Sequence, residues 1–564
     1  MTDWTGGYVS DIEYVPGFYR EQSPGQLDLA CLLCGVEPPR RLGAGESFTY
    51  CEIGCGQGTT VMALAAASPE GDFHAIDFMP AHIARAEETR QRAGLGNVSF
   101  MEADVVALAD GDGAGLPAFD YITLHGVYSW VSPAVRAGVV RFLNRFLKPG
   151  GVVYVSYNAQ PAWSAIAPTQ RMLYEFAATV QASSDERARS GIEFVKKMMA
   201  AGSPAISGNA VDQLFDLKKA TRSAPERVIY LAHEFLNGSW QPLYHMDVAR
   251  DMVDAKLSFV GMATLPENFA GIGLSDEAKT VVNGLPDGPF RETAKDYFNG
   301  RGFRRDVFVR GRRAVAADER ERRLAEAMLA PAVAPEDFKF QGDVLTTRID
   351  LAREPYQAVF DALSEGPQPV GDLVGLAHDK GASVTATEVV GFLVGLRQAL
   401  PVLCDVTTEG VEACARLNRV TLGDAFRADR RLSYALATPV GHSGLNVASV
   451  EALVLDGLFQ GVPETVEALT AHVCDRAEAD PAEIRHDAAL VSGEAAVAEQ
   501  AGDKLDTETP GGDKAKREAK YGAESDKSDD ASRPLGERVA RSVGWCLDEA
   551  LPFWRKLGLA PPPR

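Results

Sequence analysis

The sequence lacks an apolar run long enough to cross a lipid bilayer, which takes about 20 residues in a helix. The N-terminal residues, Met1 to Gly7, contain neither the basic nor the apolar segment of a secretory signal peptide. These two absences predict a cytoplasmic protein that does not insert into a membrane.

Basic residues are also in short supply. The 564-residue chain carries 57 lysines and arginines against 78 aspartates and glutamates, which gives a formal net charge of −21. A nucleic-acid surface needs a basic face to contact phosphates, so this balance predicts no nucleic-acid partner. An acidic surface suits a cationic substrate such as a lysine-bearing protein, although acidity is equally a common route to solubility.

Cysteine is sparse as well, because eight residues in a chain of this length do not form a disulfide framework. Cys31 and Cys34 form a C-x-x-C pair, but no second pair stands at a spacing suited to zinc. The pair lies in an apolar segment with helical character, where cysteine behaves as a small hydrophobic residue. The sequence therefore predicts no metal site.

The chain does contain a glycine-rich turn between a short strand and a helix, Y-C-E-I-G-C-G-Q-G-T-T beginning at Tyr50. Gly54, Gly56 and Gly58 let the backbone turn sharply and approach a ligand, since no Cβ stands in the way. The dinucleotide fingerprint G-x-G-x-x-G would need a glycine at position 59, where the chain has threonine. With Glu52 the pattern is E-x-G-x-G-x-G, which resembles motif I of the class I S-adenosylmethionine (SAM) methyltransferases. A NAD site is the alternative.

Acidic residues follow the next two predicted strands. Asp77 ends a strand that begins at Asp72, about 20 residues after Gly58, where a carboxylate can accept hydrogen bonds from both ribose hydroxyls. The alternative for Asp77 is a loop aspartate that caps the next helix. As the resemblance to motif I implies, Asp104 at the end of the strand Val98–Asp104 would accept a hydrogen bond from the adenine amine. The predicted SAM-binding residues are Glu52, Gly54, Cys55, Gly56, Gly58, Asp77, Phe78, Asp104, Val105 and His125.

Strands and helices alternate along this part of the chain, which predicts a parallel α/β sheet with right-handed crossovers. The segment Lys148–Gly151 has the residue types of a turn and is expected to precede the last of these strands. Ligands of such sheets bind at the carboxyl ends of the strands, so we expect the site there. The predicted strands are 50–53, 72–77, 98–104, 119–125 and 152–156, and the predicted helices are 61–67, 81–93 and 134–147.

After Trp163 the alternation stops, and helical periodicity dominates to about Ala220. Strand-like segments return at Leu257–Thr264 and Phe303–Val309, and we expect the second to lie antiparallel. We therefore interpret residues 162–241 as a mainly helical insertion at the carboxyl edge of the sheet, which either shapes a substrate cleft or forms a homodimer contact.

An aromatic and polar segment precedes the glycine turn. It runs from Tyr14 to Pro24, and Ser23 followed by proline is a signal for the start of a helix that reaches about Gly35. The segment either folds over the cofactor as a lid or covers the edge of the sheet.

The second half of the chain has a different organisation. A charged, alanine-rich helix is predicted from Ala314 to Ala332, and a strand at Val344–Asp350. Short helices that close on small strands predict a winged-helix-like α+β middle domain at 314–431. It shows no basic recognition helix, so a protein-interaction or structural role is favoured over DNA binding.

A C-terminal helical domain is predicted at 432–564. Its stretch 500–534 consists mainly of Asp, Glu, Lys, Gly and Ser and is predicted to be a disordered linker. The apolar residues that follow recur at helical spacing, so this last helix is expected to pack on the domain core. Pro552 should end or kink it near Leu551.

Three segments resemble one bacterial group of methyltransferases in particular. They are His125–Val131 (HGVYSWV), Ser156–Trp163 (SYNAQPAW) and Asp296–Arg305 (DYFNGRGFRR). With motif I they resemble the methyltransferases that carry a methyltransferase regulatory domain, a group that includes rickettsial lysine methyltransferases of outer-membrane protein. The resemblance implies SAM as cofactor and a Rossmann-like, seven-stranded core at 1–161 and 242–313, with the insertion as a dimerisation region.

Methyl transfer is an in-line displacement, so the protein's main task is to align a nucleophile with the sulfonium methyl group. A lysine must first lose its proton, which desolvation favours by lowering the pKa of the ammonium group. Aromatic rings would hold the cationic side chain, Asn158 would hydrogen-bond the amine, and His125 would orient it or take its proton. The alternative for the aromatic residues is plain packing of the insertion against the sheet. The predicted catalytic residues are His125, Tyr128 and Asn158, and the predicted substrate-binding residues are Trp130, Tyr157 and Trp163.

Three functions are open on the sequence. The first is a SAM-dependent methyltransferase that acts on lysine side chains of a protein, and the second is a small-molecule methyltransferase whose insertion serves as a lid. The third is a SAM-sensing interaction protein without turnover. The segment after His125 lacks the Asn/Asp-Pro-Pro-Tyr of amide- and adenine-methylating enzymes, which tells against DNA adenine and glutamine as substrates.

Overall fold

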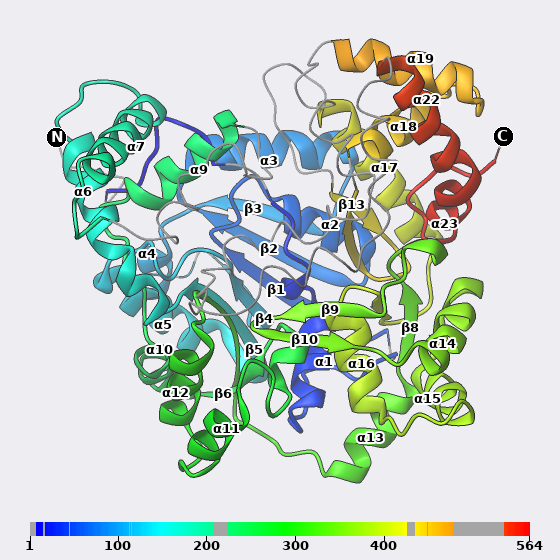
Figure 1. Ribbon diagram of the computed structural model, residues 1–564, viewed down its shortest axis with the longest axis horizontal. Helices are drawn as coiled ribbons and strands as arrows, with labels where there is room; N and C mark the ends of the chain where they lie inside the picture. The colour runs from blue at the N-terminus through cyan, green and yellow to red at the C-terminus, as the bar shows by residue number, and fades with distance from the viewer. Residues whose placement is uncertain are drawn as a thin grey trace.

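Seven strands form one central sheet in the order β3-β2-β1-β4-β5-β7-β6 (Figure 1). Strand β7 runs antiparallel to both of its neighbours, and all other adjacent pairs are parallel. The predicted α/β class and the antiparallel last strand are therefore confirmed. The strands are β1 (Phe48–Ile53), β2 (Gly71–Asp77), β3 (Val98–Glu102), β4 (Phe119–Leu124), β5 (Leu147–Asn158), β6 (Leu257–Met262) and β7 (Phe303–Arg310). This computed structural model describes residues 7–14, 17–43, 45–111, 113, 115–206, 224–425, 435–447, 449–478 and 535–563.

Helices cover both faces of this sheet, so each strand buries side chains on both sides. On one face Tyr50 and Tyr154 pack with helices α1 and α2, and we call it the Tyr154 face. On the other, Cys51 and Tyr157 pack with α5 and α10, and we call it the Tyr157 face. Successive residues of a strand point to opposite faces, which separates these neighbours in sequence. The helices of the core are α1 (Pro24–Leu33), α2 (Thr59–Ala67), α3 (Pro80–Ala93), α4 (Val105–Asp110), α5 (Pro133–Phe146) and α10 (His245–Val253).

The turn predicted at Lys148–Gly151 lies inside β5 instead of before it. Phe119 and Tyr121 of β4 pair with Leu147 and Val152, so residues 148–151 stand opposite a single residue of the neighbouring strand. A glycine at the third of these positions has a φ of +82°, which lets the extra residues bulge out without ending the strand. The turn-type residues here make a bulge.

Helices also form in the described part of the predicted insertion. They are η2 (Ala162–Ala165), α6 (Ala167–Ala177), α7 (Ser184–Ala200) and α9 (Ala224–Phe235). Figure 1 shows α6, α7 and α9 at the end of the molecule opposite the C-terminal helices. The sequence did not predict η3 (Leu265–Asn268), α11 (Asp276–Asn283) and α12 (Pro289–Asn299), which connect β6 to β7.

The middle of the chain forms small antiparallel sheets among short helices. Strand β8 stands between β11 and β12, and β9 pairs with β10. Two predicted elements are present with different bounds. The charged helix ends at Glu326 and a strand follows it. The strand predicted at Val344–Asp350 is present only over Thr347–Asp350, because the chain turns at Leu345, where φ is +53°, and Val344 ends the opposite arm of the hairpin. The elements are α13 (Ala317–Glu326), β8 (Met328–Pro331), η4 (Pro335–Asp337), β9 (Gln341–Val344), β10 (Thr347–Asp350), α14 (Arg353–Glu365), β11 (Gln368–Pro369), α15 (Val370–Asp379), α16 (Ala386–Gly395) and β12 (Ala399–Val402).

The C-terminal part is helical around one short hairpin. The sequence predicts an end or a kink of its last helix near Leu551. The helix does not end there, but its regular α-helical course is interrupted by a π-helical turn at Cys546–Ala550, just before Pro552. The expected packing of this helix on the domain core is confirmed, since Val539, Val543 and Trp554 are buried in one cluster with α18 and α19. The predicted linker 500–534 lies outside the described residues. The elements are α17 (Thr408–Ala425), β13 (Ala435–Thr438), β14 (Ser443–Asn446), α18 (Ser449–Gln460), α19 (Val466–Glu478), α22 (Leu535–Trp545), η7 (Cys546–Ala550) and α23 (Leu551–Lys556).

Candidate active site

The glycine-rich turn leaves β1 and closes onto the end of β2. The backbone N–H of Gly54 donates to the carbonyl oxygen of Ile76 at 2.7 Å, and that of Gly56 donates to Oδ2 of Asp77 at 2.8 Å. Gly54, Gly56 and Gly58 have φ values of +73°, +54° and +76°, a left-handed conformation that favours glycine. The glycine-rich segment therefore forms the tight turn that the sequence predicted.

Crowding distinguishes the three glycines. A Cβ on Gly54 would meet a methyl group of Val127 at 2.4 Å, and a Cβ on Gly58 would meet the ring of Phe100 at 2.6 Å. A Cβ on Gly56 would meet no atom within 4 Å. Gly54 and Gly58 thus permit close packing of the turn on the protein, while Gly56 faces open space that a ligand can enter.

Asp77 lies at the carboxyl end of β2 with both oxygens oriented by the backbone. Oδ1 accepts a hydrogen bond from the N–H of Met79 at 2.9 Å, and Oδ2 accepts the one from Gly56. The side chain is buried. Nδ1 of His82 also lies 3.4 Å from Oδ1. A carboxylate has about four lone-pair positions, so these three contacts leave acceptor capacity on a carboxylate whose direction is set.

Glu52 is buried at the end of β1 beside Gln22. Nε2 of Gln22 donates to Oε1 of Glu52 at 3.2 Å. The other carboxylate oxygen, Oε2, and Oε1 of Gln22 are buried and make no hydrogen bond within the described residues. Burial, reinforced by the charge of Asp77, raises the pKa of Glu52 to about 8. Two buried acceptors without donors point to a cationic or donor-bearing ligand beside the turn.

His125 follows β4 and stacks on Tyr19, with ring centroids 3.5 Å apart and planes 18° apart. Its Nδ1 forms a 2.8 Å hydrogen bond with the hydroxyl of Tyr154. Burial, with the guanidinium of Arg305 nearby, lowers the pKa of His125 to about 3. The imidazole is neutral at neutral pH, so it suits hydrogen bonding and orientation but is too weak a base to take a proton from an amine.

The predicted adenine-side residues lie around the start of α4. Asp104 is exposed and caps this helix by accepting a hydrogen bond from the N–H of Val106 at 2.8 Å, while Val105 is buried. Phe78, next to Asp77, meets the ring of Tyr8 edge-on with centroids 5.4 Å apart.

Tyr128 and Tyr157 do not stand beside His125. The hydroxyl of Tyr128 donates to Asp251 of α10 at 2.9 Å, and the hydroxyl of Tyr157 donates to Asp306 of β7 at 2.6 Å. Both rings are fully buried on the Tyr157 face, whereas the hydroxyl bonded to His125 belongs to the Tyr154 face. Their predicted catalytic and substrate roles are not supported, because both hydroxyls are used inside the core.

The two tryptophans differ in their surroundings. Trp163 is buried, its Nε1 donates to the carbonyl of Gly302 at 2.7 Å, and its ring meets Trp240 edge-on at 5.5 Å. This is the packing alternative, in which the ring fastens the insertion to the sheet. Trp130 is half-buried, and its carbonyl accepts a hydrogen bond from Asn237 at 3.1 Å.

Asn158 is the last residue of β5 and is buried. Its backbone N–H donates to Oγ of Ser129 at 2.7 Å. Its side-chain Nδ2 is buried and has no hydrogen-bond partner within the described residues. A buried amide with an unmet hydrogen bond at the carboxyl edge of the sheet is available to a bound molecule.

The N-terminal segment lies across the glycine turn. The N–H of Tyr19 donates to Oγ1 of Thr60, whose hydroxyl donates in turn to the carbonyl of Gly17. Glu13 accepts hydrogen bonds from Gln57 of the turn at 3.3 Å and from Arg85 of α3 at 2.8 Å. These contacts favour the lid alternative over a cover on the sheet edge.

Comparisons with known proteins place this geometry in a family. A family described as "Methyltransferase domain" matches residues 51–153, and one described as "Predicted methyltransferase regulatory domain" matches residues 228–310. An uncharacterized protein of Synechocystis sp. is 32% identical over 463 residues, which cover 80% of this chain and 87% of that protein. The chain belongs to the SAM-dependent methyltransferases that carry a methyltransferase regulatory domain.

Other relatives agree with this assignment. An uncharacterized protein of Rickettsia prowazekii is 28% identical to this methyltransferase over 176 residues, 31% of this chain and 67% of that protein. The structure of PKMT2 from Rickettsia typhi, in complex with AdoHcy, has the same fold with a TM-score of 0.63 and 16% identity, covering 97% of this chain and 99% of that one. No helix among the described residues is long and apolar enough to cross a membrane.

The regulatory-domain match has a structural meaning in this methyltransferase. It begins within α9 of the insertion and ends at the last residue of β7, so it contains β6 and the antiparallel strand. The region that carries the regulatory name therefore completes the central sheet.

The residues around the turn fit SAM. Its α-ammonium group would meet the unpaired acceptors of Glu52 and Gln22, and its ribose hydroxyls the oriented carboxylate of Asp77. The open space at Gly56 admits the ligand between them. These observations agree with SAM as the cofactor of the methyltransferase.

Sequence reasoning missed two residues of this site, Tyr19 and Gln22. Both precede the predicted helix start, in the segment for which a lid over the cofactor is one of two alternatives, with no residue singled out. No local spacing relates position 22 to Glu52 or position 19 to His125, since these contacts arise when the segment folds across the sheet.

Proposed function

We propose that this methyltransferase transfers the methyl group of SAM to lysine side chains of a protein substrate. Support comes from the segments that resemble rickettsial lysine methyltransferases and from the fold shared along the whole chain with PKMT2 of Rickettsia typhi. The net charge of −21 favours a cationic side chain and disfavours nucleic acid as the partner.

The observation that carries the proposal is the unpaired amide of Asn158 at the carboxyl end of β5. SAM, when bound, would supply the methyl group: an amine nitrogen would attack the methyl carbon in line, so that the N–C bond forms while the S–C bond breaks and its electron pair leaves with the sulfur of S-adenosylhomocysteine. Oδ1 of Asn158 would accept a hydrogen bond from an N–H of the amine, which leaves the nitrogen lone pair free to face that methyl group, and the unpaired Nδ2 would donate to an acceptor of the bound substrate or cofactor. The neutral imidazole of His125, fixed between Tyr19 and Tyr154, would orient groups at the same edge without taking the proton.

The amine must reach the site without its proton. The buried surroundings of Asn158 would disfavour the charged ammonium, so the proton would pass to solvent as the side chain enters. The proposed cofactor contacts remain Glu52, Gly54, Cys55, Gly56, Gly58, Asp77, Phe78, Asp104, Val105 and His125, and Trp130 remains a proposed substrate-side residue.

The test uses the purified full-length chain with methyl-labelled SAM and a bacterial lysate. Half of the lysate is first treated so that its lysine amines are acetylated, and Asp77→Ala protein serves as the inactive control. We expect label in protein bands of the untreated lysate and its loss after acetylation. Label that persists after acetylation identifies another nucleophile, label confined to small molecules supports a small-molecule enzyme, and SAM binding without transfer supports a sensor. Each of these three results overturns the proposal.

A further inference from the structure

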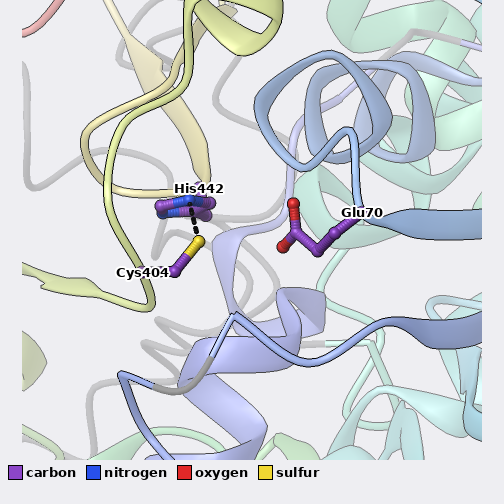
Figure 2. A group of neighbouring side chains, drawn as sticks. All are labelled: Glu70, Cys404 and His442. Carbon is purple, nitrogen blue, oxygen red and sulfur yellow. Dashed lines mark hydrogen bonds between the residues drawn. The ribbon is translucent and has the colours of Figure 1, made fainter.

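A second cluster of reactive side chains lies away from the glycine turn, at Glu70, Cys404 and His442 (Figure 2). Sγ of Cys404 lies 3.0 Å from Nε2 of His442. One potential ligand atom from each of the three residues lies within 4.8 Å of the others. Figure 2 shows the carboxylate of Glu70 facing the cysteine–histidine pair.

Three segments that are remote in sequence supply these side chains. Glu70 precedes β2, Cys404 follows β12, and His442 lies in the turn between β13 and β14. The cluster therefore joins the methyltransferase sheet to two elements of the second half of the chain.

The cluster has polar atoms without partners. Oε1 of Glu70 and Nδ1 of His442 are buried and make no hydrogen bond within the described residues. His442 is almost completely buried and has a φ of +47°, a left-handed conformation that is uncommon outside glycine. An unusual backbone conformation that aims a buried imidazole at a thiol and a carboxylate calls for a functional explanation.

We propose that Glu70, Cys404 and His442 bind a divalent transition-metal ion, with zinc preferred. Thiolate, imidazole and carboxylate are the ligands that zinc takes in proteins, commonly three of them with water in the fourth position. On binding, the S–H bond of Cys404 breaks, the sulfur bonds to the metal and the proton passes to solvent.

Charge at the cluster is compatible with this ion. The thiolate and the Glu70 carboxylate together offset the two positive charges of zinc. Arg40, which acts electrostatically on the same three residues, is itself ion-paired with Asp28 at 3.2 Å. Arg40 therefore keeps a counterion when the metal binds.

The site is distinct from the one that binds SAM. Glu70 stands before the amino end of β2 and Asp77 stands at its carboxyl end, seven residues later, which corresponds to about 20 Å. We therefore assign the ion a structural role, in which it links the methyltransferase core to the second half of the chain, and no role in methyl transfer.

The test is metal binding by the full-length chain, freed of metal with a chelator, in the absence of SAM. Co²⁺ serves as a spectroscopic probe because a cysteine ligand adds thiolate-to-metal charge-transfer absorption, and Zn²⁺ is measured by competition with a coloured chelator. We expect one tightly bound Zn²⁺ per chain, the charge-transfer band with Co²⁺, and a higher Tm in the presence of Zn²⁺.

Two pairs of variants make the test specific. Cys404→Ser and His442→Asn should each weaken Zn²⁺ binding by at least about 100-fold. Removal of a residue that only hydrogen-bonds to a metal ligand already lowers metal affinity by about 10- to 100-fold, and these two residues are proposed ligands themselves. Asparagine tolerates the left-handed backbone, so the second variant preserves the turn. The matched controls Cys34→Ser and His472→Asn should bind Zn²⁺ normally.

Two results overturn the proposal. The first is a wild-type chain that binds no Zn²⁺ at micromolar concentration, which makes the cluster a buried hydrogen bond only. The second is a charge-transfer band that survives Cys404→Ser, which places the metal elsewhere. Neither result bears on the proposed methyl transfer, because no step of this test contains SAM or a methyl acceptor.

Discussion

The carboxylate of Asp77 accepts a hydrogen bond from the backbone N–H of Gly56, with the two atoms 2.8 Å apart. This bond ties the end of β2 to the one glycine of the turn that faces open space. The carboxylate is thus oriented before any ligand arrives, which lowers the entropic cost of binding one. Changes at Asp77 should therefore weaken cofactor binding, and they also remove the acceptor that holds the backbone N–H groups of Gly56 and Met79.

Replacing Asp77 with alanine should weaken SAM binding by about 100-fold or more, because two hydrogen bonds to a charged group are each worth about 1.5–3 kcal/mol. Calorimetric titration with S-adenosylhomocysteine measures the change. Asp110→Ala, which removes an exposed carboxylate paired with Arg141, is the matched control and should bind normally. Unchanged affinity in Asp77→Ala would show that the ribose assignment is wrong.

Glu52 should make cofactor binding depend on pH. Because its pKa is raised to about 8 by burial, the ligand-free protein holds this carboxyl group protonated near pH 7. An arriving ammonium group favours the ionised form, so binding releases a proton, and affinity should rise by up to about tenfold per pH unit as the pH increases towards about 8. The measurement is a series of titrations across this range.

The control for this dependence is Glu52→Gln. The amide keeps the shape of the side chain and cannot ionise, so the remaining pH dependence reports only the ligand. A slope in the variant equal to that of the wild-type chain would contradict a role for Glu52 in holding the ammonium group.

Asn158 should affect methyl transfer without affecting the cofactor. In Asn158→Ala the rate of label incorporation into protein should fall by about 10- to 100-fold, since misplacement of a reacting group by about 1 Å costs as much. Affinity for S-adenosylhomocysteine should stay within about twofold of wild type. Asn144→Ala, on the exposed side of α5, should leave both quantities unchanged, and an equal loss in the two variants would remove Asn158 from the site.

Tyr128→Phe and Tyr157→Phe should affect stability instead of the reaction. Tyr128→Phe removes the hydroxyl that donates to Asp251, and Tyr157→Phe removes one of the donors to Asp306, which keeps its bonds with His245 and Arg304. Loss of one such hydrogen bond costs about 1 kcal/mol of unfolding free energy. Urea unfolding measures this loss, and label incorporation by the folded variants should stay within about twofold of wild type. A large loss of transfer at full stability would restore the catalytic role that the sequence suggested.

Local patterns predicted the elements that carry the cofactor site. The strand at Phe48–Ile53, the turn and the helix at Thr59–Ala67 follow from glycine positions and apolar residues within a few positions of one another. The same holds for Asp77, whose place at a strand end depends on the length of one strand. Boundaries were less secure where turn-type residues occur inside an element, as in the bulge of β5.

Which face a side chain occupies could not be derived in the same way. His125 and Tyr128 are only three positions apart in one loop, yet the first reaches the Tyr154 face and the second the Tyr157 face. The face that each side chain reaches depends on the path of an irregular loop and on which helix covers each face of the sheet. Neither is encoded in periodicity.

The amino-acid sequence by itself determined the fold class and the position of the glycine turn and Asp77 at the carboxyl end of the sheet, because both depend on short-range patterns of glycine, acid and apolar residues. Only the tertiary structure decided which polar atoms are left without partners. Segments that are remote in sequence meet on folding and create these sites. They are the acceptors of Gln22 and Glu52, the amide of Asn158 and the cluster around Cys404. Hydrogen bonds and metal ligands require atoms within a few ångströms, and no spacing along the chain specifies such distances between remote segments.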